Sequence, residues 1–192
     1  MRFATPFAGG FSLSAILLIS GAAMALAQDA AAPKKPSEVV TTQSYVSLDP
    51  VPRGKEFQAV VVVKIATGYH MNSHKPSDSY LIPTTLTPQL PTGFTLTEAN
   101  YPPGRDEKFP FSPDKPLNVY SGSVTLRLRL TAENGAALGP TTIPVTLRFQ
   151  ACNMSACLPP VKVPVDLQVK VAAAGAAGRA THPEIFSEKF AK

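Results

Sequence analysis

The chain has 192 residues, of which 44% are hydrophobic and 16% charged, with 20 prolines, two cysteines and a formal net charge of +5. This composition excludes a wholly disordered chain, the prolines argue against a helical bundle, and two cysteines are too few for a disulfide-dense miniprotein or a four-cysteine zinc site. The positive charge forms no basic block interleaved with aromatic residues, so nucleic acid is not an expected partner.

The first 27 residues have the organisation of a cleavable export signal. Arg2 is followed by an apolar stretch that ends in a small-x-small site at residues 25–27. This pattern predicts a signal peptide over residues 1–27, with a retained membrane anchor as the alternative. Export places the mature chain in an oxidising compartment, which we expect to be the periplasm. No later apolar run approaches about 18 residues, so no membrane span is expected after cleavage.

The rest of the chain is dominated by strand-like patterns. Residues 28–38 are expected to be a flexible leader, and closely spaced prolines predict a long irregular loop over residues 101–116. Short strands with no convincing helix between them predict an all-β fold, an immunoglobulin-like antiparallel β-sandwich over residues 39–171. The expected strands cover residues 39–48, 57–65, 81–86, 92–99, 120–130, 142–149 and 161–171.

Residues 172–192 begin with an Ala/Gly linker and end in a pattern typical of a short helix. Pro183 suits a first helical turn, and Phe186 and Phe190 lie four residues apart on one helical face. We expect this segment to be either a docked cap or a mobile tail.

Cys152 and Cys157 flank four residues in a stretch that is typical of a hairpin. Facing positions on antiparallel strands have Cα atoms about 4.5–5.5 Å apart, which a disulfide tolerates. A bond that closes so short a loop stabilises the fold by roughly 2 kcal/mol in the chain-entropy account, which makes it a weak staple. Cross-strand bonds at a loop can also be exposed and easily reduced. The residues alone leave open whether the pair is redox-active or structural.

Residues 147–160, Leu-Arg-Phe-Gln-Ala-Cys-Asn-Met-Ser-Ala-Cys-Leu-Pro-Pro, resemble the active-site hairpin of the N-terminal periplasmic domain of the thiol:disulfide interchange protein DsbD. Two further segments resemble that family in the same order. They are Thr-Gly-Tyr-His-Met-Asn at residues 67–72 and Asn-Val-Tyr-Ser-Gly at residues 118–122. The resemblance spans residues 39–171, nearly all of the expected folded part.

This resemblance implies a domain that receives two electrons from a thioredoxin-like donor and passes them to periplasmic disulfide proteins through mixed disulfides, without a cofactor. By position it implies that Cys157 attacks and Cys152 resolves. Full-length family members also carry a membrane-embedded domain and a thioredoxin-like domain, neither of which is in this sequence. We therefore expect a detached redox domain of the protein-disulfide reductase type, supplied by a separate thioredoxin-like or membrane donor.

The family also has a cap loop whose aromatic ring shields the disulfide. The resemblance assigns this loop to residues 105–111, with Phe109 as the expected shield. Asp106 or Glu107 near a thiol would disfavour the thiolate. The alternative is a solvated turn whose Phe side chains enter the core.

Tyr69, His70 and Asn72 are expected to surround the disulfide, with His70 able to assist thiolate formation near Cys157. His70 and His74 could also indicate a copper site, although positions i and i+4 of a strand lie about 13 Å apart. An ordinary polar loop is the plainer interpretation of this segment, and no metal is expected. Two alternatives to thiol–disulfide exchange therefore stay open: a non-catalytic immunoglobulin-like binding module with a structural disulfide, and a copper-handling domain.

Overall fold

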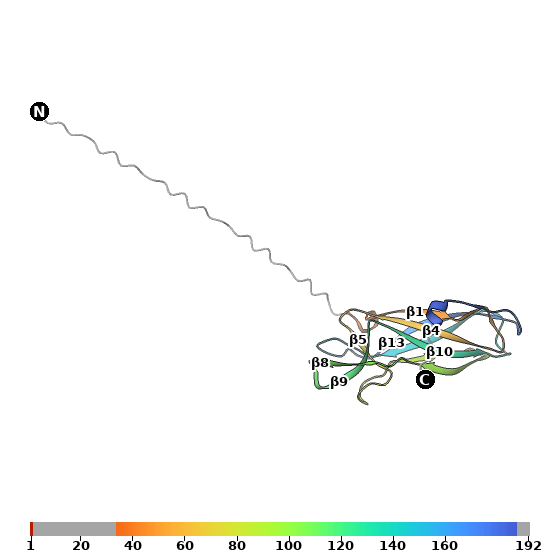
Figure 1. Ribbon diagram of the computed structural model, residues 1–192, viewed down its shortest axis with the longest axis horizontal. Helices are drawn as coiled ribbons and strands as arrows, with labels where there is room; N and C mark the ends of the chain where they lie inside the picture. Colours follow the sequence, from red (N-terminus) through yellow and green to blue (C-terminus); the bar gives the residue numbers. More distant parts are fainter. Residues whose placement is uncertain (2–33, 188–192) are drawn as a thin grey trace. The chain divides into compact units, whose positions relative to one another are not determined.

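A computed structural model describes Met1 and residues 34–187 (Figure 1). Apart from Met1, the predicted signal peptide lies outside the described residues, as does the leader up to residue 33. Within the described part, two short helices, η1 (Pro36–Glu38) and α1 (Pro183–Phe186), accompany a fold built of strands. The strands are β1 (Val40–Val46), β2 (Leu48–Asp49), β3 (Val51–Pro52), β4 (Lys55–Ile65), β5 (His70–Asn72), β6 (Thr85–Pro88), β7 (Phe94–Asn100), β8 (Arg105–Phe109), β9 (Ser112–Ser121), β10 (Ser123–Ala132), β11 (Gly139–Phe149), β12 (Ala151–Cys152), β13 (Val161–Ala172) and β14 (Arg179–Ala180).

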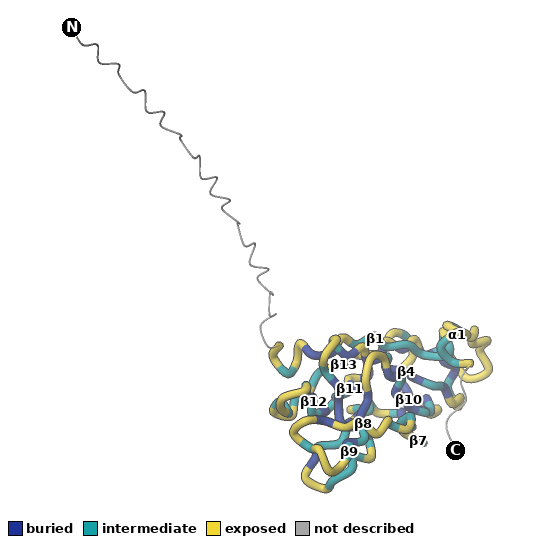
Figure 2. Tube along the Cα trace, turned by 60° about the vertical axis from the view of Figure 1, so that its left-hand side comes forward, coloured by how far each residue is buried: buried dark blue, intermediate teal, exposed yellow. Residues whose placement is uncertain are grey.

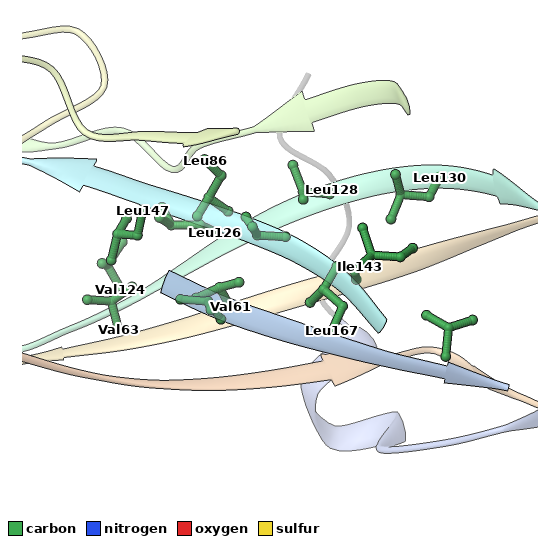
Figure 3. Close-up of a cluster of buried hydrophobic side chains, with 14 of the residues drawn as sticks. Val61, Val63, Leu86, Val124, Leu126, Leu128, Leu130, Ile143, Leu147 and Leu167 are labelled. Carbon is green, nitrogen blue, oxygen red and sulfur yellow. The ribbon is translucent and has the colours of Figure 1, made fainter. Parts of the chain in front are cut away.

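Two four-stranded sheets form the sandwich, with strand orders β1-β4-β10-β7 and β3-β13-β11-β6. Their pairings are antiparallel except for the short parallel contact between β3 and β13. Apolar side chains of both sheets meet in one core (Figure 3). The predicted all-β immunoglobulin-like sandwich is therefore confirmed. The labelled core residues are Val61, Val63, Leu86, Val124, Leu126, Leu128, Leu130, Ile143, Leu147 and Leu167.

The predicted strand over residues 120–130 is two strands that belong to different sheets. Gly122 separates β9 from β10 and has a φ of 70°, in the left-handed region that favours glycine. Beyond this corner the alternation is as predicted, because Val124, Leu126, Leu128 and Leu130 are all buried.

A third sheet, with strand order β12-β5-β9-β8, lies beside the sandwich and was missed from the sequence. The segment interpreted as a polar loop contains its strand β5, and residues 101–116, expected to be irregular, contain β8 and part of β9. The prolines are tolerated because β5 pairs only with residues 119–121, which leaves residues 112–118 of β9 with a partner on one side only. The β8–β9 register also shifts between Glu107 and Phe109, as at a bulge.

The two faces of this small sheet have different roles because side chains alternate along each strand. Met71, Tyr120 and Ala151 belong to the main core. Cys152 and His70 are paired across β12 and β5, so they share the opposite face. The β8–β9 hairpin, largely exposed around its turn, borders this second face (Figure 2).

Both ends of the described chain are attached to the sandwich. Residues 36–38, expected in a flexible leader, form η1, and the N–H of Lys34 just before it donates to the Tyr69 phenol oxygen (3.2 Å). At the other end β14 pairs with β2, and the Arg127 guanidinium donates to the Ile185 carbonyl (3.1 Å). Of the short helix predicted near the C-terminus, the described residues contain the single turn α1, and residues 188–192 lie outside the described part. Nothing helical in residues 34–187 has the length and apolarity that a membrane crossing requires.

Candidate active site

Cys152 and Cys157 form a disulfide that closes the hairpin predicted from their spacing. They are antiparallel partners with Cα atoms 3.8 Å apart. Cys152 has no exposed surface, whereas Cys157 is half-buried. Cys157 is therefore the more accessible cysteine of the pair.

The loop between the cysteines is held by its own hydrogen bonds. The Asn153 N–H donates to the Ala156 carbonyl (2.9 Å), and the Leu158 N–H donates to the Ala151 carbonyl (2.7 Å). The Asn153 side-chain oxygen accepts from the N–H groups of Ser155 (2.8 Å) and Ala156 (3.0 Å). This Asx-type turn holds the loop in addition to the disulfide.

His70 lies directly across from Cys152 in the pairing of β5 with β12. Only 4% of His70 is exposed, and its Nε2 is buried with no hydrogen-bond partner. Its ring stacks on Phe109, with 4.0 Å between centroids and 21° between planes. Burial lowers the pKa of His70 below its usual 6.5, and the Glu107 carboxylate opposes this shift.

Phe109, the expected shield of the disulfide, is a buried residue at the end of β8. It is 3% exposed and packs in a small cluster with Leu81, Leu117 and Val119. Phe111 stacks on it with 5.4 Å between centroids and is 38% exposed. Three rings are thus stacked in a row, from buried His70 of β5 through Phe109 to the surface at Phe111.

A pocket of about 270 Å³ lies at Cys157. Phe111 of the β8–β9 hairpin lines this pocket, and Phe109 does not. The shielding role of Phe109 stays a prediction. The lining residues are Tyr80, Leu81, Phe111, Ser112, Leu117, Gln150, Ala156 and Cys157.

Gln150 belongs to this site, although its place in residues 147–160 gave it no predicted role. Its Oε1 accepts from Asn72 Nδ2 (3.1 Å) and from the Ile82 N–H (3.3 Å), and its Nε2 donates to the Leu158 carbonyl (3.3 Å). Asn72 is fully buried, and its own Oδ1 has no partner. The sequence feature that could have indicated a role for Gln150 is an amide side chain at the end of an apolar strand, immediately before the cysteine hairpin.

The two acids of the hairpin are engaged away from the pocket. Asp106 accepts from Asn118 Nδ2 (2.7 Å), and Glu107 accepts from Ser121 Oγ (2.9 Å). Neither acid lines the pocket at Cys157. Of the two, Glu107 acts on the site electrostatically through His70.

Tyr69 and His74 are turned to other surroundings. Tyr69 packs against the main core, and its phenol oxygen accepts from the Lys34 N–H (3.2 Å). His74 stacks on Tyr101 with 3.7 Å between centroids, and its Nδ1 is 2.9 Å from the Thr84 carbonyl. Among the described residues, no three His, Cys, Asp or Glu side chains gather as a metal-binding group.

Fold and site together define a β-sandwich domain that carries an unequally exposed cysteine pair on a capped hairpin. The family model described as thiol:disulfide interchange protein DsbD, N-terminal, matches residues 37–169. This chain belongs to that family. A search of curated proteins gives no significant match.

Solved structures of such domains are distant in sequence. The reduced DsbD N-terminal domain of Neisseria meningitidis is 16% identical, with 77% of this chain and 94% of that chain covered and a TM-score of 0.44. The N-terminal periplasmic domain of ScsB from Proteus mirabilis is 9% identical, with coverages of 76% and 51% and a TM-score of 0.48. A chain in the structure of the complex between the DsbD and PilB N-terminal domains of N. meningitidis is 18% identical, with 64% of this chain and 80% of that chain covered and a TM-score of 0.38.

Proposed function

We propose that this chain is a periplasmic thiol–disulfide exchange module that relays two electrons through Cys152 and Cys157. The observation that carries the proposal is a disulfide between two cysteines that differ in exposure, in a chain of the DsbD N-terminal family. The donor is a thioredoxin-like or membrane protein, and the acceptors are periplasmic disulfide proteins. In this proposal residues 1–27 direct export, residues 28–38 are a leader, residues 39–171 are the redox domain and residues 172–192 are a tail.

The first half of the relay reduces the chain. A donor thiolate attacks Cys157 Sγ, so that the Cys152–Cys157 bond breaks and Cys152 leaves with the electron pair. The second donor thiolate then attacks the donor sulfur of the mixed disulfide and releases Cys157. The donor ends as a disulfide, and its two protons end on the two cysteine thiols of this chain.

The second half of the relay reoxidises the cysteine pair and reduces the acceptor. The Cys157 thiolate attacks an acceptor disulfide, forms a mixed disulfide and releases one acceptor thiol. Cys152 then attacks Cys157 Sγ, which restores the Cys152–Cys157 bond and releases the second acceptor thiol. Cys157 is the attacking sulfur because it is half-buried and can be solvated as a thiolate, whereas burial disfavours ionisation of Cys152.

The reduction potential separates an exchange module from a structural disulfide. Equilibration with a thioredoxin-type dithiol should give a potential less negative than about −300 mV, because structural disulfides lie below that value. A more negative value contradicts the proposal.

Single-cysteine variants test which sulfur attacks. The probe is a thioredoxin-like protein that keeps only its attacking cysteine, with that sulfur joined to a small thiol leaving group. Cys152→Ala should form a stable mixed disulfide with this probe. Cys157→Ala should form little, since its remaining thiol is buried. The variant without either cysteine is the control, and equal trapping by both single variants would contradict the assignment.

A further inference from the structure

His70 is a polar side chain placed against the buried thiol of the pair. Strand register makes His70 the cross-strand partner of Cys152, and paired residues have Cβ atoms about 4.5–5.5 Å apart on one face of the sheet. Cys157, in contrast, lines the pocket, and His70 does not. The register therefore favours Cys152 as the thiol that His70 serves.

The imidazole carries an unused hydrogen-bonding atom. His70 Nε2 is buried without a partner, although a buried polar atom left unpaired costs roughly 1–3 kcal/mol. Its ring is fixed on one side by Phe109, which is itself buried among apolar residues. A histidine held in place by stacking, with one ring nitrogen unsatisfied, is poised to exchange a proton with a neighbour.

Among the groups that face His70, Cys152 is the one that can exchange a proton with the unpaired Nε2. From β9 the cross-strand neighbour is Ser121, whose hydroxyl already donates to Glu107 of β8 (2.9 Å). The other β8 residue in contact is Phe109, which has no titratable group. From β12 the neighbour is Cys152, which gains a thiol proton whenever the disulfide is reduced.

We propose that His70 Nε2 accepts the proton of the Cys152 thiol in the step that resolves the mixed disulfide at Cys157. This inference rests on the proposed exchange function. In the step, the Cys152 S–H proton moves to Nε2 and the freed electron pair forms the Cys152–Cys157 bond. The bond between Cys157 and the acceptor sulfur breaks, the acceptor leaves as a thiolate that takes a proton from water, and His70 later returns its proton to solvent.

Burial of both groups explains why a local proton acceptor is needed. A fully buried thiol such as Cys152 resists ionisation, so solvent hydroxide alone would make resolution slow at neutral pH. The same burial lowers the pKa of His70, which keeps the imidazole neutral and able to take a proton. The nearby Glu107 carboxylate favours the imidazolium that forms.

The test uses the reduced chain and 5,5′-dithiobis(2-nitrobenzoate), a small disulfide that needs no protein partner. Attack by Cys157 releases the first thionitrobenzoate, and resolution by Cys152 releases the second. His70→Gln should leave the first phase unchanged and slow the second at pH 7 by at least about 10-fold, the lower range for loss of a general base. His74→Gln is the matched control, because that ring stacks on Tyr101 away from the hairpin.

The wild-type chain gives a readout that does not depend on any variant folding. With His70 as acceptor, the second phase should be independent of pH between 7 and 8.5, since the imidazole is already neutral there. A second phase that rises about tenfold per pH unit over this range, or one that is equally fast in His70→Gln, overturns the inference and leaves the exchange function standing. Failure of the wild type to release a second thionitrobenzoate overturns the exchange function itself.

Discussion

Asn72 and Gln150 are joined by two hydrogen bonds, one from the Asn72 N–H to the Gln150 carbonyl and one from Asn72 Nδ2 to Gln150 Oε1, each 3.1 Å long. The same Gln150 carboxamide accepts from the Ile82 N–H and donates to the Leu158 carbonyl. One side-chain amide thus connects β5, the segment at Ile82 and the segment that follows Cys157. Because Gln150 also lines the pocket, its position sets one wall of the site.

Replacing Gln150 by Ala should destabilise the chain by about 1–3 kcal/mol, because the buried Asn72 amide and the Ile82 N–H lose their acceptor. Urea unfolding of the oxidised protein measures this change. Gln168→Ala is the control, since Gln168 is an exposed residue of β13, and it should change stability by no more than about 0.5 kcal/mol. Equal effects of the two substitutions would contradict the connecting role of Gln150.

The two cap phenylalanines should behave differently on substitution. Phe109→Ala removes a buried ring and should lower stability by about 3–5 kcal/mol. Phe111→Ala should change stability by less than about 1 kcal/mol because the ring is partly exposed, but it should speed reduction of the disulfide by dithiothreitol. Urea unfolding and a stopped-flow reduction assay measure the two effects. A Phe111→Ala variant reduced at the wild-type rate would show that this ring does not obstruct Cys157.

Reduction of the disulfide should destabilise the domain only modestly. The loop between Cys152 and Cys157 is short, so the chain-entropy account gives about 2 kcal/mol, or a melting temperature lower by roughly 4–8 °C for a chain of this size. Differential scanning calorimetry with and without reductant measures the shift. Global unfolding on reduction would identify the bond as a structural staple instead.

The buried His70 should make stability fall in acid. Burial lowers its pKa in the folded chain below 6.5, so the unfolded chain binds more protons between the two pKa values. The stabilising contribution is present above pH 6.5 and is lost as the pH falls through the folded-state pKa. His70→Gln removes this linkage. The free energy of unfolding of the wild type minus that of the variant should therefore be smaller at pH 5 than at pH 7, as measured by urea unfolding. An unchanged difference between the two chains would contradict the burial of an ionisable ring.

Long regular elements were predictable from the sequence because their patterns are strong. β4, β11 and β13 show apolar or alternating runs that survive in the structure nearly to their predicted ends. The hairpin at Cys152 and Cys157 was predictable for a different reason, since four intervening residues suffice to bring two antiparallel positions together.

The small sheet was not predictable because pairing between segments far apart in the sequence determines its strands. β5 has three residues, and its strand conformation comes from pairing with β9 and β12, which lie far away in the chain. The position of Phe109 has the same origin, because a register shift in the β8–β9 pairing precedes this ring and its place in the small cluster. The proximity of His70 to Cys152 likewise depends on strand register that no sequence window contains.

Alternation along β5 has a consequence for how such a domain can diversify. Met71 fills the interior, while its neighbours His70 and Asn72 lie on the other face of the strand. A substitution on that face opens no void in the main core, but both residues are buried, so the new side chain must restore their packing and hydrogen bonds. Inserting or deleting one residue would turn the strand over and send the imidazole inward. This strand therefore tolerates side chains of similar size and polarity and hardly any change of length.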